Sequence, residues 1–153
     1  MDELLAEIRS RHFPNAPVSE AAIESFERSN GIVLPDDMRS FYACCDGAEL
    51  FRAEPDDPPF RLMRLSELTR ARVAIYGEDG EEYGPSSDFV FCDVLDGNFA
   101  AIQLESKSAN FGRIIDCFHE TYPDPDYLTV IASSFSEFLK KALHSSGSYM
   151  DLL

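Results

Sequence analysis

The segment from Val18 to Gly47 constrains the fold most, because it predicts two short amphipathic helices joined by a tight turn. Ser19 is a natural N-cap for the first helix, and Gly31 is suited to end it because glycine tolerates the left-handed conformation of a C′ residue. Pro35 fits the first turn of the second helix, where its missing N–H is no loss. The second helix carries an apolar stripe at i, i+3, i+4 and i+7, formed by Met38, Phe41, Tyr42 and Cys45. The segment therefore predicts a helix pair that faces a core, and it contains no catalytic grouping.

The rest of the chain favours an α+β fold with a largely antiparallel sheet. Asp96-Gly97, between two apolar runs, is a strong hairpin signal because type I′ turns need positive φ at both central positions. The pattern predicts further helices at residues 3–12, 66–76 and 134–143, and extended segments or strands at 48–51, 60–65, 89–104 and 113–118. Hairpins dominate and no regular βαβ alternation is visible, which favours this fold over a doubly wound sheet. At 153 residues we expect a single domain.

Three motifs in a fixed order resemble the SUKH superfamily, the Smi/Knr-type domain named for a fungal regulator of cell-wall synthesis. They are the G-x-x-L-P turn Gly31-Ile32-Val33-Leu34-Pro35, then residues 62–68, then residues 131–139. The resemblance covers residues 18–143, roughly, and implies one SUKH-like domain over residues 1–153. It implies a sheet of about five or six strands packed with N-terminal and C-terminal helices.

The same resemblance implies two functions. Bacterial members of the superfamily are commonly immunity proteins, each of which neutralises a toxin, often a nuclease. The fungal namesake implies instead an intracellular regulatory or scaffold protein with several partners. Neither reading involves catalysis, so the resemblance leads us to expect a protein-binding module.

The charge of the chain is strongly negative. Asp and Glu number 28 against 13 Lys and Arg, a formal net charge of −15, which argues against direct binding to nucleic acid or to anionic membranes. Between Tyr76 and Asp126 lie twelve acids and only two basic residues. This excess serves solubility, or it steers a basic protein partner such as a toxin domain.

The second reading of the charge predicts a set of partner-binding residues. Acidic loops would supply most of the contacts, and one tyrosine would act as an aromatic anchor, since binding hot spots favour such side chains. The predicted residues are Asp56, Asp57, Glu78, Asp79, Glu81, Glu82 and Asp88, with Tyr83 as the anchor.

We expect a cytoplasmic protein. No apolar run approaches the roughly 20 residues of a membrane helix, and the acidic N-terminus is unlike the basic start of a signal peptide. The four cysteines are expected to be buried thiols, typical of a reducing compartment. A bridge between Cys92 and Cys117 stays open if their strands are neighbours.

The residue types give little support to catalysis, and we expect no cofactor and no metal. The loop at residues 78–82 lacks the register of a calcium loop, and His119-Glu120 lacks the second histidine of a zinc-protease helix. A weaker alternative is a small hydrolase that uses Cys117 and His119, which would share one face of a strand. A buried thiol beside a surface histidine is the favoured reading of this pair.

Overall fold

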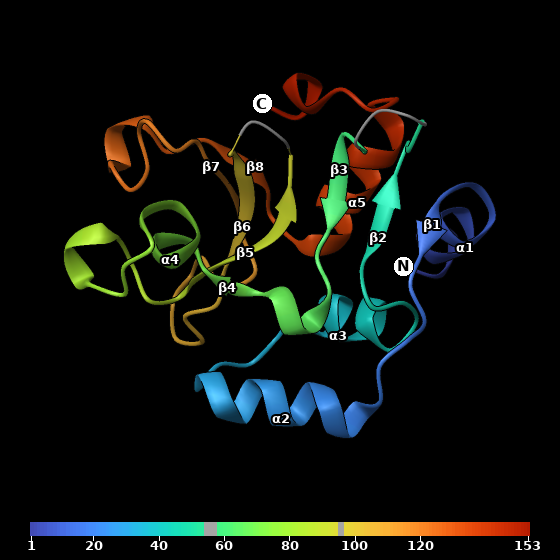
Figure 1. Cartoon of the computed structure of the whole chain (residues 1–153), viewed down its shortest axis with the longest axis horizontal. Helices are drawn as coiled ribbons and strands as arrows, with labels where there is room; N and C mark the ends of the chain where they lie inside the picture. The colour runs from blue at the N-terminus through green and yellow to red at the C-terminus, as the bar shows by residue number, and fades with distance from the viewer. Residues whose placement is uncertain (54–57, 95–96) are drawn as a thin grey trace.

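An antiparallel sheet of eight strands forms the centre of the computed structural model, which describes residues 1–53, 58–94 and 97–153 (Figure 1). The strands are β1 (Phe13–Pro14), β2 (Ala48–Leu50), β3 (Phe60–Leu62), β4 (Thr69–Arg70), β5 (Asp88–Asp93), β6 (Phe99–Gln103), β7 (Ile114–Cys117) and β8 (Val130–Ala132). Their order is β1-β2-β3-β5-β6-β7-β8, with β4 paired to β5. The predicted α+β class is confirmed, and the sheet is larger than the five or six strands expected.

Five α-helices and four 3-10 helices accompany the sheet in the described part of the chain. The α-helices are α1 (Asp2–Arg11), α2 (Glu20–Asn30), α3 (Asp36–Tyr42), α4 (Ala71–Tyr76) and α5 (Phe135–His144). The 3-10 helices are η1 (Leu65–Glu67), η2 (Glu81–Tyr83), η3 (Pro125–Tyr127) and η4 (Tyr149–Leu152). None of the helices within these residues is both long and apolar enough to cross a membrane.

The helix ends follow the caps predicted from the sequence. Ser19 Oγ accepts a 3.2 Å hydrogen bond from the N–H of Ala22, and Gly31 ends α2 with φ 65°. Ser134 Oγ likewise accepts the N–H of Glu137 at the start of α5. Pro35 differs slightly, because it is the N-cap of α3 rather than its first residue. These caps satisfy amide groups that a helix cannot bond internally.

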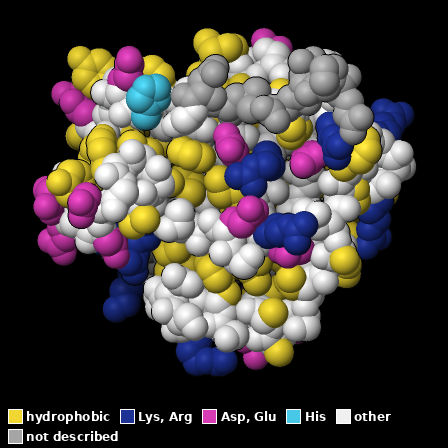
Figure 2. Space-filling view, in the orientation of Figure 1, with side chains coloured by type: hydrophobic (Ala, Val, Ile, Leu, Met, Phe, Trp, Pro, Cys, Tyr) yellow, Lys and Arg dark blue, Asp and Glu magenta, His cyan; other side chains and the backbone are white. Residues whose placement is uncertain are grey.

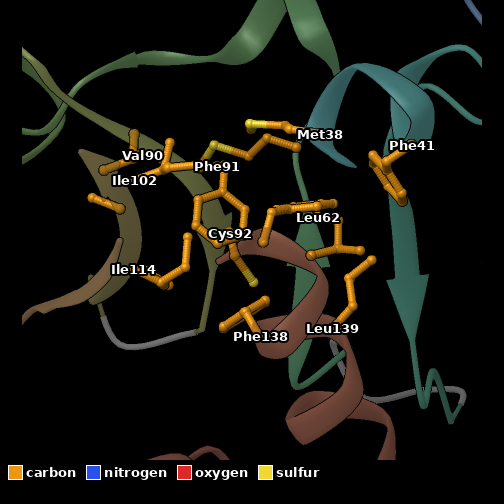
Figure 3. Close-up of a cluster of buried hydrophobic side chains, with 14 of the residues drawn as sticks. Met38, Phe41, Leu62, Val90, Phe91, Cys92, Ile102, Ile114, Phe138 and Leu139 are labelled. Atoms are coloured by element: carbon orange, nitrogen blue, oxygen red, sulfur yellow. The ribbon is translucent and has the colours of Figure 1, made fainter. Parts of the chain in front are cut away.

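The core lies between α5 and the sheet (Figure 3). Phe138 of α5 packs edge-on against Phe91 of β5 and Phe60 of β3, with ring centroids 5.0 and 6.5 Å apart. Phe135 contacts Phe91 and also Phe41 of α3, so three elements meet at this helix. The buried stripe predicted for α3 is observed, and α5 buries a stripe formed by Phe135, Phe138, Leu139, Ala142 and Leu143. One buried cluster contains residues from Leu5 to Leu152.

The helix predicted over residues 66–76 is wrong in its first half. Glu67 accepts the N–H of Arg64 and closes a single 3-10 turn, η1. Thr69 and Arg70 then pair with Val90 and Phe89 as β4 before α4 begins. Pairing with the sheet therefore overrides the helical pattern at these positions.

The open question of a Cys92–Cys117 bridge is settled by the sheet order. Cys92 pairs with Ala100 of β6, and Cys117 pairs with Phe99 on the other side of β6. Two strand spacings separate β5 from β7 by about 9–10 Å, whereas a disulfide needs Cα atoms about 4.4–6.8 Å apart. The two cysteines therefore cannot pair in this fold, and all four cysteines are free thiols.

Candidate partner-binding surface

An acidic loop projects between α4 and β5, at residues 77–87. Glu78, Asp79, Glu81 and Glu82 are all exposed in this loop. Figure 2 shows acidic side chains gathered at the left edge of the molecule, where Figure 1 places the segment that follows α4. Tyr83 is half-buried, and its ring packs on Tyr76 with centroids 5.3 Å apart. The structure thus brings five of the predicted contact residues together in one loop, which we call the acidic loop.

Two arginines hold the acidic loop in place. Arg72 is 5% exposed, and its guanidinium donates to Asp79 Oδ1 over 2.7 Å and to the carbonyl of Gly84 over 2.9 Å. Arg70 donates to Asp79 Oδ2 and to the carbonyl of Ser86. The hydrogen bond from Arg72 lowers the pKa of Asp79, aided by the charge of Arg70. Asp79 therefore anchors the acidic loop to Arg70 and Arg72.

The other three carboxylates of the loop have no such role. Within the described residues, the side chains of Glu78, Glu81 and Glu82 form no hydrogen bond or ion pair. Charged side chains that hold nothing inside the chain stay available to an external partner. They are the strongest contact candidates among the predicted residues.

Asp88 lies behind the surface rather than on it. Its side chain is 2% exposed at the start of β5, where Tyr122 Oη and Gln103 Nε2 each donate to the carboxylate over 3.3 Å. Burial raises the pKa of Asp88, and these two hydrogen bonds oppose the rise. A side chain so enclosed supports neighbouring loops and offers no contact area of its own. Asp56 and Asp57 lie outside the described residues.

A second loop, at residues 119–127, was not included in the predicted set. Glu120, Asp124 and Asp126 are exposed there, and Tyr127 is 66% exposed. Tyr76 Oη donates to the backbone carbonyl of Tyr122, which fastens this loop to α4, and the Tyr76 ring also packs on Tyr83 of the acidic loop. The run of Pro, Asp and Tyr in the sequence signals a loop, but nothing in that run indicates its neighbour in space. The two loops together form what we call the acidic edge.

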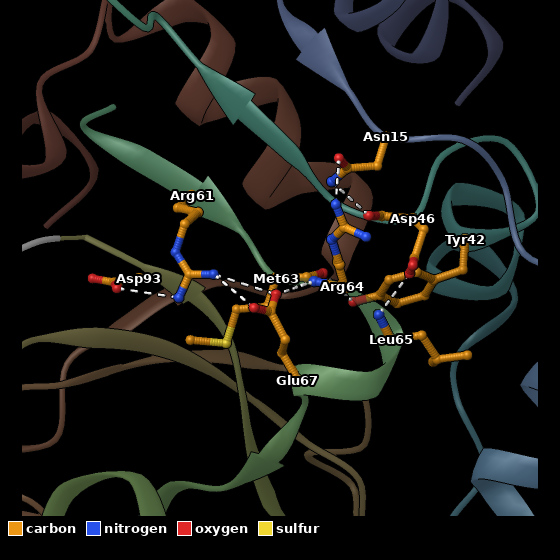
Figure 4. A network of polar contacts seen from close by, with 9 residues as sticks. All are labelled: Asn15, Tyr42, Asp46, Arg61, Met63, Arg64, Leu65, Glu67 and Asp93. Carbon is orange, nitrogen blue, oxygen red and sulfur yellow. Dashed lines mark hydrogen bonds and ion pairs between the residues drawn. The ribbon is translucent and has the colours of Figure 1, made fainter. Parts of the chain in front are cut away.

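The open face of β2, β3 and β5 has a different electrostatic character (Figure 4). Arg61 of β3 lies between Glu67 and Asp93, at 3.2 and 3.4 Å, and Arg64 donates to Asn15. Asp46 accepts the N–H of Leu65 over 2.7 Å. Opposite charges alternate on this face and bond to one another. Its carboxylates are therefore committed to the fold, unlike Glu78, Glu81 and Glu82 of the acidic edge.

The arrangement needed for the hydrolase alternative is absent. β7 ends at Cys117, so His119 lies beyond the strand and shares no strand face with it. Cys117 is fully buried, and burial raises the pKa of its thiol, which keeps it protonated and unreactive. His119 is exposed, with Nδ1 3.0 Å from Asn98 Oδ1. Across residues 1–53, 58–94 and 97–153, no cluster of three or more His, Cys, Asp or Glu side chains could hold a metal ion.

An α+β sheet with this helix order and the G-x-x-L-P turn defines the class of protein to which the chain belongs. Residues 17–141 match the SMI1 / KNR4 family (SUKH-1), so the chain is a member of that family. It is also 31% identical over 116 residues to a protein named immunity protein YokJ from Bacillus subtilis (strain 168). That alignment covers 76% of this chain and 68% of the relative.

Proposed function

We propose that this protein is an immunity protein that binds a toxin and neutralises it, with no catalytic step of its own. The name of the relative YokJ supports immunity over the regulatory or scaffold alternative. The observation that carries the proposal furthest is the acidic loop, whose Glu78, Glu81 and Glu82 are exposed and hold nothing inside the described chain. A protein with so many uncommitted charges on one edge is suited to a partner of opposite charge.

The proposed partner is a basic toxin domain, which the net negative charge of this chain favours. Nuclease toxins must carry Lys and Arg to hold phosphates, and a protein of net charge −15 attracts such a surface over long range. The Arg72–Asp79 ion pair and the Arg72–Gly84 hydrogen bond order the loop before binding. Preordering reduces the entropy lost on association, so affinity rises without further contacts.

The unpaired cysteines suit the cytoplasm, which we propose as the site of action. All four are free, as is usual where cellular reductants keep thiols reduced. Binding there would occlude the toxin before it reaches its substrate. Cys117 is buried and His119 is exposed, so this pair gives no support to the hydrolase alternative.

The test is co-expression with the product of the neighbouring gene, followed by a pull-down and a toxicity rescue assay. Wild-type protein should bind that product and restore growth. The variant Glu78→Lys, Glu81→Lys, Glu82→Lys should weaken binding by roughly tenfold or more at low salt, because each reversal replaces attraction by repulsion.

The matched control places the same reversal elsewhere. Glu3, Glu24 and Asp151 are exposed on α1, α2 and η4 and form no side-chain bond within the described chain. Reversal of these three should leave rescue nearly intact. Equal loss in both triple variants would refute the acidic loop as the contact, and no binding by the wild type would refute the immunity function for that pair.

A further inference from the structure

Two open hollows adjoin on the acidic edge, and Pro123 is a wall of both. The first has a volume of about 550 Å³ and lies between the acidic loop and Glu105, with Pro85 and Pro123 among its walls. The second has a volume of about 580 Å³ and is lined by Tyr127, Glu120 and Asp124. Each hollow is large enough for a long side chain, and Pro123 lies where the two hollows adjoin.

The first hollow carries negative charge that the protein does not neutralise. Glu81 and Glu105 line it, and neither side chain has a hydrogen bond or ion pair within the described residues. Arg72 also lines the hollow, but its guanidinium is already bonded to Asp79 and Gly84. A cationic side chain is therefore the complement that this hollow lacks.

The second hollow adds an aromatic wall. Tyr127 is 66% exposed, so the face of its ring is open to a ligand. Glu120 and Asp124 are exposed and line the same hollow, so the ring lies in a negative field. An aromatic face in a negative field attracts a guanidinium or ammonium group by the cation–π interaction.

Hydrogen bonds hold the two hollows in a constant relation. Tyr76 Oη donates to the Tyr122 carbonyl, and Tyr122 Oη donates to the buried carboxylate of Asp88. Tyr122 thus fastens the second loop to both α4 and β5. Two sites at a fixed spacing bind a partner that presents two matching side chains better than two mobile sites would.

We propose that the acidic edge receives a basic protein segment that crosses Pro123, with one Arg or Lys side chain in the first hollow beside Glu81 and Glu105 and another against Tyr127. This inference rests on the proposed function, because the segment would belong to the toxin. It also extends that function, since Glu105 and Tyr127 become specificity-determining residues that the sequence did not indicate.

The test uses N-acetyl-arginine amide as a probe and N-acetyl-citrulline amide as its uncharged match, each titrated into ¹⁵N-labelled protein. Arginine should shift the amide signals of Ser86, Ser87, Glu105 and Tyr127, and citrulline should shift them several-fold less. The variant Glu81→Gln, Glu105→Gln should weaken arginine binding in the first hollow by roughly fivefold. Glu3→Gln, Glu24→Gln removes the same charge elsewhere and should leave that binding unchanged.

A second pair of variants isolates the ring. Tyr127→Ala should abolish the arginine-dependent shifts around Glu120 and Asp124, whereas Tyr127→Phe should keep most of them because the aromatic face remains. Equal shifts with citrulline, equal loss in the control variant, or no difference between Ala and Phe would overturn the inference. If the toxin binds but N-acetyl-arginine amide does not bind in the hollows, only this inference fails. If arginine selects the hollows but no toxin binds, the proposed function fails instead.

Discussion

At the scale of single residues, two glycines with similar backbones differ in their surroundings. Gly31 and Gly47 have φ of +65° and +79°, but a Cβ on Gly31 would meet no atom of the described residues within 4 Å, whereas one on Gly47 would lie 2.5 Å from the carbonyl oxygen of Leu62. Gly31→Ala should lower the free energy of unfolding by about 1 kcal/mol, for the left-handed backbone alone. Gly47→Ala should lower it by about 3 kcal/mol or more. Urea denaturation measures both, and equal losses would contradict the close approach at Gly47.

The Tyr149–Asp116 hydrogen bond predicts a pH-dependent loss of stability. Tyr149 Oη donates to Asp116 Oδ1 over 2.6 Å; burial raises the pKa of Asp116, and this bond opposes the rise. In Tyr149→Phe the folded-state pKa of Asp116 should rise further above its unfolded-state value. The variant should therefore lose more stability than the wild type as the pH increases from the unfolded-state pKa through the folded-state pKa. At neutral pH we expect a loss of about 1 kcal/mol, since Asp116 is half-exposed.

Below the ordinary pKa of an aspartate, Asp116 is protonated in both folded and unfolded protein, and the loss in Tyr149→Phe should shrink. Urea denaturation at neutral and acidic pH measures the difference. Tyr127→Phe is the control, because the Tyr127 hydroxyl forms no hydrogen bond within the described chain. A loss that stays constant with pH would show that Asp116 does not titrate through this bond.

At the scale of elements, α5 joins the sheet to the N-terminal helices. Phe138 is fully buried against Phe60 and Phe91, so Phe138→Ala should lower the free energy of unfolding by about 3–4 kcal/mol through lost contacts and a cavity. Lys140→Ala, on the exposed side of the same helix, should change it by less than about 0.5 kcal/mol. If Phe138→Ala does not fold, Phe138→Leu should still show a smaller loss. A neutral result for both Phe138 variants would contradict the packing of α5.

The helices could be predicted from the sequence because their signals are local. Caps such as Ser19 and stripes such as that of α5 repeat over two or three turns. β1 and β4 have two residues each, too few for any alternation, and they form only because a distant strand pairs with them. The acidic loop was predicted from composition. The burial of Asp88 and the position of Tyr127 on the acidic edge depend on tertiary contacts, which a linear pattern does not contain.

At the scale of the whole molecule, the excess negative charge divides into acids that hold the fold and acids that do not. Glu27, Glu67 and Glu137 each accept a backbone N–H over 2.8 Å, from Leu34, Arg64 and Ser133. The glutamates of the acidic loop have no such bonds within the described chain. Like charges on one molecule repel and destabilise its compact state. We therefore expect the glutamates of the acidic loop to lower stability slightly.

Two triple variants that remove equal charge should separate these classes of glutamate. Glu78→Gln, Glu81→Gln, Glu82→Gln should raise the free energy of unfolding by a few tenths of a kcal/mol at low ionic strength, because self-repulsion falls. Glu27→Gln, Glu67→Gln, Glu137→Gln should lower it by about 1–2 kcal/mol despite the same relief, because ion pairs to Arg39, Arg61 and Lys141 are lost. Urea denaturation measures both. High salt should erase the gain of the first variant, since screening removes the repulsion for all forms alike. Destabilisation by the first variant would instead give the acidic loop a structural role and weaken the case that its charges await a partner.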